Sequence, residues 1–177
     1  QRALAGLGRS YQITSVFPEF TVLENVALAV QAHAGHSFHF WRRAKDDKAL
    51  LGPARAALDM VGMGAMQDRP VATLAHGQRR QLEIAMTLAT GARLLLLDEP
   101  MAGMGSAESE AVVALLRRLK GQCTILLVEH DMDAVFALAD RITVLVYGRV
   151  IASGTPEQIR ASPEVREAYL GDEAEPY

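Results

Sequence analysis

The sequence lacks several features that mark particular classes of protein. It contains one cysteine, Cys123, so no disulfide bond can form within the chain, and this usage is typical of a reducing compartment. No apolar run reaches the roughly 18 residues that a membrane span needs, and no signal peptide is recognisable. The net charge is only −3, from 18 Lys and Arg against 21 Asp and Glu. A basic surface for nucleic acid is therefore not indicated.

The composition instead favours a globular domain with a substantial core, because 50% of the 177 residues are hydrophobic. Internal repeats and low-complexity tracts are not apparent. The chain starts at Gln1 rather than at a methionine, and we expect it to be a fragment.

The most informative stretch is Leu94–Leu97, followed by Asp98 and Glu99. Four consecutive leucines predict a short strand buried on both faces, as in a parallel sheet. Ligand sites in open α/β sheets lie at the carboxyl ends of strands, where these two acids fall. Asp98 could hold Mg²⁺ through a water, and Glu99 could orient or deprotonate a water that attacks a nucleotide γ-phosphate. The alternative interpretation is a buried strand that ends in two solvated acids.

The segment after Pro100 alternates between helical and strand patterns. We expect a helix capped by Ser106, a second buried strand over Cys123–Val128, and a helix from Met132. Strands over Ile142–Tyr147 and Arg149–Ala152, joined by a turn at Gly148, follow this helix. Later helix starts are predicted at the capping box of Thr155 and Gln158 and at Ser162-Pro163. The alternation predicts a doubly wound parallel sheet.

The segment before Leu94 is helical in pattern and predicts a small helical subdomain. Thr21 and Glu24 form a capping box for a helix that extends to about Ala34. A second helix is predicted over 53–62, and a third, with Leu82, Ala85, Met86 and Ala89 on its apolar stripe, should be capped by Gly91. Gly77 lies near the start of the third helix, where backbone N–H groups favour a phosphate; an ordinary helix start is the alternative.

His33, His36 and His39 recur at every third position beside aromatic and basic residues. Such spacing could gather imidazoles around a metal ion, but Gly35 interrupts the helix and no further ligand lies nearby. We favour an exposed segment that contacts a partner, because aromatic residues and arginine are enriched at interfaces.

Taken together, five motifs resemble those of the ATPase subunits of ABC transporters. Gln12 matches the Q-loop, Leu74–Gln78 the signature motif, Leu94–Glu99 the Walker B motif, Ala102–Gly105 the D-loop and His130 the switch histidine. Three further stretches look like the subunits that serve branched-chain amino-acid transporters. They are Tyr11–Val26 and the tail from Ala152 to Gly171, together with Gln81–Ala85.

The resemblance implies a partial P-loop NTPase core of the α/β class, with a parallel sheet and an inserted helical subdomain. Residues 1–15 would be a strand and Q-loop remnant, 16–90 the helical subdomain, 91–154 the α/β core, and 155–177 C-terminal helices and tail. A Walker A motif requires a lysine followed by Ser or Thr. The only lysines in the chain are Lys45, Lys48 and Lys120, and none is followed by Ser or Thr, so the motif is absent from this sequence. The resemblance thus implies a chain that starts after its P-loop and is inactive alone.

Site roles also follow from the resemblance. Asp98 and Gln12 would contact Mg²⁺, Glu99 would polarise the attacking water, and His130 would contact the γ-phosphate. The residues implied in ATP binding are Gln12, Leu74, Ala75, His76, Gly77, Gln78 and Gly103. Ala75 departs from the serine usual in the signature motif, and Gly105 departs from the Asp or Asn usual in the D-loop.

The implied cofactors are ATP and Mg²⁺. The implied partners are a second ATPase subunit, identical or different, and transmembrane permease subunits, with no nucleic acid. The implied location of this chain is peripheral, at the cytoplasmic face of the plasma membrane. Two alternatives stay open. One is an ABC ATPase that acts on nucleic acid or the ribosome without membrane subunits, and the other is a non-enzymatic fragment that only binds a partner.

Overall fold

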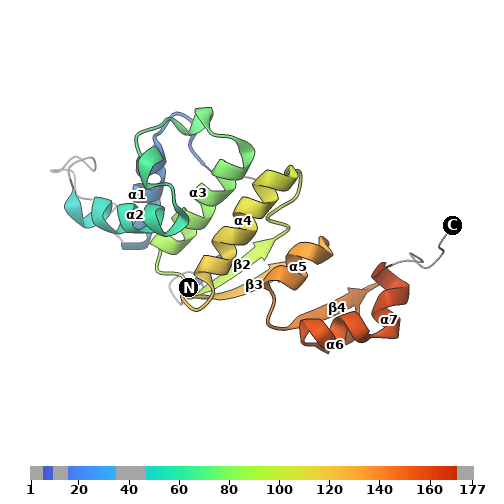
Figure 1. Ribbon diagram of the computed structural model, residues 1–177. Coiled ribbons are helices and arrows are strands. Elements are labelled where there is room, and N and C mark those ends of the chain that lie inside the picture. Colours follow the sequence, from blue (N-terminus) through green and yellow to red (C-terminus); the bar gives the residue numbers. More distant parts are fainter. Residues whose placement is uncertain (1–5, 10–15, 35–46, 171–177) are drawn as a thin grey trace. The chain divides into compact units, whose positions relative to one another are not determined.

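The computed structural model describes residues 6–9, 16–34 and 47–170 (Figure 1). The chain divides into two compact units, residues 1–129 and 130–177. The first unit contains a three-stranded parallel sheet, and the second contains a two-stranded antiparallel sheet. The parallel sheet predicted from the leucine strand is therefore confirmed in the first unit, whereas the last two strands pair with each other.

The parallel sheet has the order β1–β2–β3, with β2 in the centre. Its strands are β1 (Leu7–Arg9), β2 (Leu94–Asp98) and β3 (Thr124–Val128). Leu95 pairs with Gly8 on one side and with Ile125 on the other, and Asp98 pairs with Val128. The carboxyl ends of β2 and β3 therefore lie side by side, as parallel pairing requires.

The two faces of this sheet differ. Leu95 and Leu97 are 0% and 2% exposed, and on the same face a methyl group at Gly8 would overlap Thr87 of α3 (His76–Ala89). On the opposite face, Leu126 and Val128 are 58% and 55% exposed. The prediction of strands buried on both faces was wrong, because helix α3 covers the first face and nothing described here covers β3 on the second.

Helices α1 (Val22–Ala34), α2 (Lys48–Val61) and α3 pack against one another and form a helical cluster within the first unit. The predicted capping box is confirmed: Thr21 N donates to Glu24 Oε2 at 2.8 Å, and Glu24 N donates to Thr21 Oγ1 at 3.2 Å. Short 3₁₀ turns at Gly64–Met66 and Val71–Thr73 connect α2 to α3.

Helix α2 begins five residues earlier than predicted, so that Pro53 lies inside it. Asp47 provides the start, because its Oδ1 accepts a hydrogen bond from Ala49 N at 2.9 Å. The helix ends at Gly62, whose φ of 78° is the left-handed conformation of a C-cap. Pro53 was a wrong indicator of the helix start, because the favourable N-cap at Asp47 outweighs the one N–H group that proline lacks.

Helix α4 (Ser106–Leu119) follows the loop after β2. Its buried stripe is confirmed, with Val112, Leu115, Leu116 and Leu119 at most 1% exposed. The predicted cap was wrong by one residue. Gly105 is the N-cap, and Ser106 is the first helical residue and makes no capping hydrogen bond.

The second unit holds α5 (Met132–Leu138), the hairpin strands β4 (Ile142–Val146) and β5 (Arg149–Gly154), α6 (Pro156–Ala161), α7 (Pro163–Val165) and a π-helical turn at Arg166–Leu170. Tyr147 and Gly148 have φ angles of 48° and 74°, which turn the chain tightly between the two strands. The core joins the hairpin to both later helices and consists of Ile142, Val144, Ile159 and Val165. The predicted capping box of Thr155 and Gln158 is confirmed.

Candidate functional site

The predicted pair of acids lies where the leucine strand ends. Asp98 is the last residue of β2, and Glu99 follows with a φ angle of 43°. A non-glycine residue in this left-handed region is strained, and such residues concentrate at functional sites. Glu99 N donates to Val128 O at 2.9 Å, so β3 holds the first residue beyond the strand.

The loop after Glu99 folds into a compact turn. Ala102 N donates to Glu99 O at 3.1 Å, and Met104 N donates to Met101 O at 3.2 Å. Gly103 adopts a φ of 74°, a conformation that glycine reaches without strain. Glu129, the residue after β3, accepts a hydrogen bond from Met101 N at 3.1 Å. The ends of two neighbouring strands therefore fix this loop.

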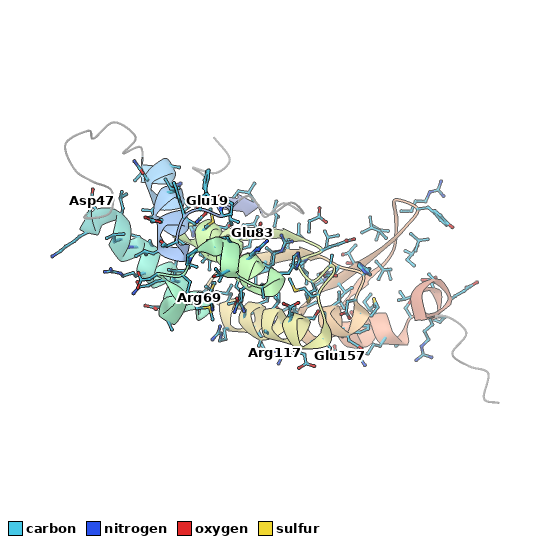
Figure 2. All side chains as sticks on the ribbon, turned by 90° about the horizontal axis from the view of Figure 1, so that it is seen from above. Glu19, Asp47, Arg69, Glu83, Arg117 and Glu157 are labelled. Carbon is cyan, nitrogen blue, oxygen red and sulfur yellow. The ribbon has the colours of Figure 1, made fainter. Side chains whose placement is uncertain are left out.

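Helix α3 contributes a buried ion pair to the same edge of the sheet. Arg80 and Glu83 are 5% and 8% exposed, and Arg80 Nη1 lies 2.8 Å from Glu83 Oε2. Glu83 is labelled on α3 in Figure 2. The second nitrogen, Arg80 Nη2, donates to Asp98 O at 3.0 Å. The helix that follows the signature-like segment is thus bonded directly to the end of β2.

Sequence reasoning did not find Arg80, Glu83 or Glu129. A buried Arg and Glu three residues apart on a helix look like an ordinary exposed ion pair until the covering elements are known. The one available signal was that Glu83 adjoins the apolar stripe that contains Leu82 and Ala85, which are both 0% exposed. Glu129 comes directly after a strand, just as Glu99 does, and this shared position could have identified Glu129 as a candidate.

The segment Leu74–Gln78 forms the start of α3. Leu74 is 4% exposed, Ala75 is the N-cap, and Gln78 Oε1 accepts a hydrogen bond from Ala75 N at 3.1 Å. Alanine has no acceptor in its side chain, so only half of a capping box is present. Gly77 is buried, and its N–H donates to Glu108 Oε1 of α4 at 3.3 Å. His76 is exposed at the start of the helix.

The remaining predicted residues lie elsewhere. Gln12, His36 and His39 are outside the described residues, and His33 is half-exposed in the last turn of α1. His130 begins the second unit, whereas Asp98 and Glu99 belong to the first. Asp131, beside His130, caps α5 by accepting a hydrogen bond from Ala134 N at 3.1 Å.

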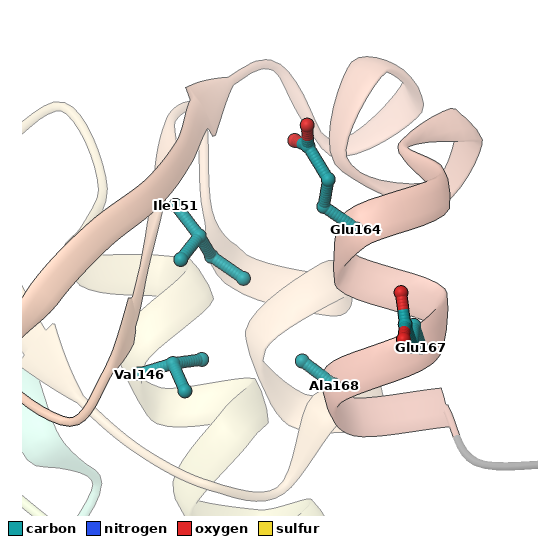
Figure 3. Close-up of a pocket in the computed structure, with 5 residues that line it drawn as sticks. All are labelled: Val146, Ile151, Glu164, Glu167 and Ala168. Carbon is teal, nitrogen blue, oxygen red and sulfur yellow. The ribbon is translucent and has the colours of Figure 1, made fainter.

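The described residues offer little that could hold a ligand at these positions. Among the described residues, no group of three or more His, Cys, Asp or Glu side chains could hold a metal ion. Mg²⁺ in nucleotide sites usually keeps several waters and binds one or two carboxylates together with substrate phosphates. Asp98 at the strand end fits this limited requirement. A shallow pocket in the second unit is lined by Val146, Ile151, Glu164, Glu167 and Ala168 and contains no predicted site residue (Figure 3).

Comparison with known proteins identifies the class to which this chain belongs. The family model of ABC transporters matches residues 2–102. The chain therefore belongs to the ABC transporter family, in which such cassettes hydrolyse ATP. A second model, described as a branched-chain amino acid ATP-binding cassette transporter, matches residues 149–175.

Two of the relatives are ATP-binding proteins of branched-chain amino acid transport. The chain is 37% identical to BraF of Pseudomonas aeruginosa, a high-affinity branched-chain amino acid transport ATP-binding protein, over 96% of this chain and 69% of BraF. It is also 37% identical to LivG of Escherichia coli, of the same description, over 97% of this chain and 70% of LivG.

Solved structures agree on the fold. The ADP conformation of MJ1267, an ATP-binding cassette of an ABC transporter, superposes with a TM-score of 0.78 at 24% identity, over 96% of this chain and 70% of MJ1267. At this identity the likeness establishes the ABC cassette fold. None of the helices in the described residues has the length and apolar character to cross a bilayer.

Proposed function

We propose that this chain is part of the ATP-hydrolysing subunit of an importer for branched-chain or related amino acids. The observation that carries the proposal is the conformation of Glu99, which is held at a φ of 43° directly after Asp98 at the carboxyl end of β2. Strain of this kind is maintained only where surrounding contacts impose it, and here they come from β3 and α3.

In the proposed mechanism, Asp98 and Glu99 have separate tasks. Asp98 would hold the hydrated cation of MgATP, and Glu99 would orient the water that attacks the γ-phosphate. Mg²⁺, when bound, neutralises charge that develops on the phosphate oxygens. Gln12 is proposed to contact the cation or this water, and His130 the γ-phosphate.

The start of α3 is proposed to face a nucleotide held by a second ATPase subunit. The positive dipole end of this helix suits a phosphate. The segment that would make this contact comprises Leu74, Ala75, His76, Gly77 and Gln78. Gly103, in the loop after Glu99, is proposed to lie at the same interface.

The proposed partners are a second ATPase subunit and transmembrane permease subunits, with this chain at the cytoplasmic face of the membrane. The similarity to BraF and LivG supports this choice over an ATPase that acts on nucleic acid. Affinity purification separates the two, because the proposal requires co-purification of permease subunits. Recovery of nucleic acid or ribosomes in their place would favour the alternative.

Transport provides the direct test. The gene that contains this chain would be deleted, and uptake of labelled leucine, isoleucine and valine would be measured. We expect uptake to fall and to return with the wild-type gene but not with its Glu99→Gln variant. Normal uptake in the deletion strain under conditions that express the gene would contradict the proposed substrate class.

A further inference from the structure

The peptide group between Asp98 and Glu99 is held from both sides. Its carbonyl, Asp98 O, accepts the hydrogen bond from Arg80 Nη2 of α3 at 3.0 Å. Its N–H, on Glu99, donates to Val128 O of β3 at 2.9 Å. Both polar atoms of one planar group are therefore bonded to different elements of the first unit.

This peptide plane controls the conformation of Glu99. Rotating the plane changes the ψ angle of Asp98 and the φ angle of Glu99 together, so it is the local movement that would relieve the φ of 43°. Rotation would break both hydrogen bonds. A strained residue persists only where its surroundings determine its conformation.

Arg80 is itself fixed. Its guanidinium makes one bond to Glu83 at 2.8 Å and another to Asp98 O, and a planar guanidinium that donates in two directions has little freedom to turn. Glu83 compensates the buried positive charge, which would otherwise be costly at 5% exposure. The ion pair therefore places a rigid donor at the end of β2.

We propose that Arg80, oriented by Glu83, is a positioning residue that clamps the Asp98–Glu99 peptide and so holds Glu99 in its left-handed conformation. The catalytic consequence rests on the proposed function of Glu99, whereas the clamp itself does not. The clamp also connects α3, one turn beyond Gly77, to the residue proposed to orient the attacking water. Arg80 acts through the backbone and is not assigned a contact with the nucleotide.

The test must remove the clamp without leaving a buried unpaired charge. Arg80→Gln alone would leave the buried Glu83 carboxylate without its ion-pair partner and could prevent folding. The double variant Arg80→Met with Glu83→Leu replaces the pair by apolar side chains, an exchange that buried ion pairs often tolerate, and eliminates the bond to Asp98 O. Arg80→Lys keeps the charge and one donor. Arg93→Met, an exposed arginine just before the other end of β2, is the matched control.

The first measurement is hydrogen exchange of the 177-residue chain over residues 98–104. Release of the peptide should speed exchange of the Glu99 and Ala102 amides by about tenfold or more in the double variant, because their acceptors depend on this geometry. The control should leave these rates unchanged. Unchanged exchange in a folded double variant would overturn the clamp, whatever the function of the protein.

The second measurement is ATP hydrolysis by the longest gene product that contains this chain. We expect the double variant to lower kcat by about tenfold with the KM for MgATP within about twofold, and Arg80→Lys to recover part of the loss. A wild-type protein that hydrolyses ATP together with a double variant of unchanged kcat would overturn the positioning role alone. A wild-type protein that does not hydrolyse ATP would contradict the proposed function. The hydrogen-exchange rates alone would then show whether the clamp exists.

Discussion

Two groups of helices in this chain begin differently. Helices α1 and α6 begin with complete capping boxes, made by Thr21 with Glu24 and by Thr155 with Gln158. Helices α3 and α4 have Ala75 and Gly105 as their N-cap residues, and neither residue has a side chain that accepts from the helix. An N-cap side chain that accepts from the helix is thus present at the first two starts and missing at the other two.

The difference coincides with the proposed site. Ala75 and Gly105 lie in the segments that match the signature motif and the D-loop. Residues that break a local rule are expected where function imposes its own requirement. The two starts also meet each other, since Gly77 N of α3 donates to Glu108 of α4 at 3.3 Å. Complete side-chain caps thus stabilise the starts of α1 and α6, whereas the start of α3 is tied to α4.

The largest effect is expected at Gly77. Gly77→Asp would place a carboxylate beside Glu108, at the helix start proposed to face a phosphate, since an added Cβ already comes within 3.3 Å of Glu108 Cβ. We expect ATP hydrolysis by the gene product to fall at least about 100-fold, roughly 2.7 kcal/mol. Gly52→Asp, on a helix where a Cβ meets nothing within 4 Å, is the control. Equal rates of ATP hydrolysis in the two variants would show that the start of α3 has no special role in the reaction.

The next effect concerns stability alone. Thr21→Ala removes half of a complete box and should lower the free energy of unfolding by about 1 kcal/mol in urea titrations. Ser106→Ala, at the first position of α4, removes a hydroxyl that caps nothing and should change it by less than about 0.5 kcal/mol. A similar loss in both variants would mean that the two kinds of helix start do not differ.

A smaller effect should follow from completing the unusual start. Ala75 has the extended φ and ψ of an N-cap, −65° and 164°, so Ala75→Ser can supply the missing acceptor without a backbone change. We expect a gain of about 0.5 to 1 kcal/mol in the free energy of unfolding. A loss of stability would show that α3 tolerates no side-chain acceptor at its start.

The smallest effect is a pH dependence at α6. The hydrogen bond with Thr155 lowers the pKa of Glu157 from its ordinary value of 4.5. Because the pKa is lower in the folded state, the stabilisation is present above 4.5 and is lost as the pH falls through the folded pKa. Glu157→Gln should slightly reduce the stability that the protein loses at acid pH. An identical pH profile in wild type and variant would exclude this contribution.

Much of the fold was predictable because its signals are local. The ends of α1 and the capping boxes of Thr21 and Thr155 depend on residues within one turn of each other. The position of Asp98 at the end of β2 follows from a run of four leucines. Such features depend little on the rest of the chain.

The features that were missed depend on what covers an element. The alternation of Leu126 and Val128 with half-buried neighbours on β3 cannot be distinguished from a buried strand until the covering helices are known. The same holds for Arg80 and Glu83, whose burial follows from the approach of α3 to the end of β2. The roles of Glu99, His130 and Gln12 stay predictions, because placement alone does not test chemistry.

The most direct test of the account is ATP hydrolysis by the longest gene product that contains this chain, in the wild type and in Glu99→Gln. The substitution keeps the size of the side chain and removes the group proposed to orient water. We expect MgATP to bind both proteins with similar affinity and the variant to hydrolyse it at least about 100-fold more slowly. Hydrolysis at the wild-type rate by Glu99→Gln would contradict the central claim that the strained acid after β2 acts on the attacking water.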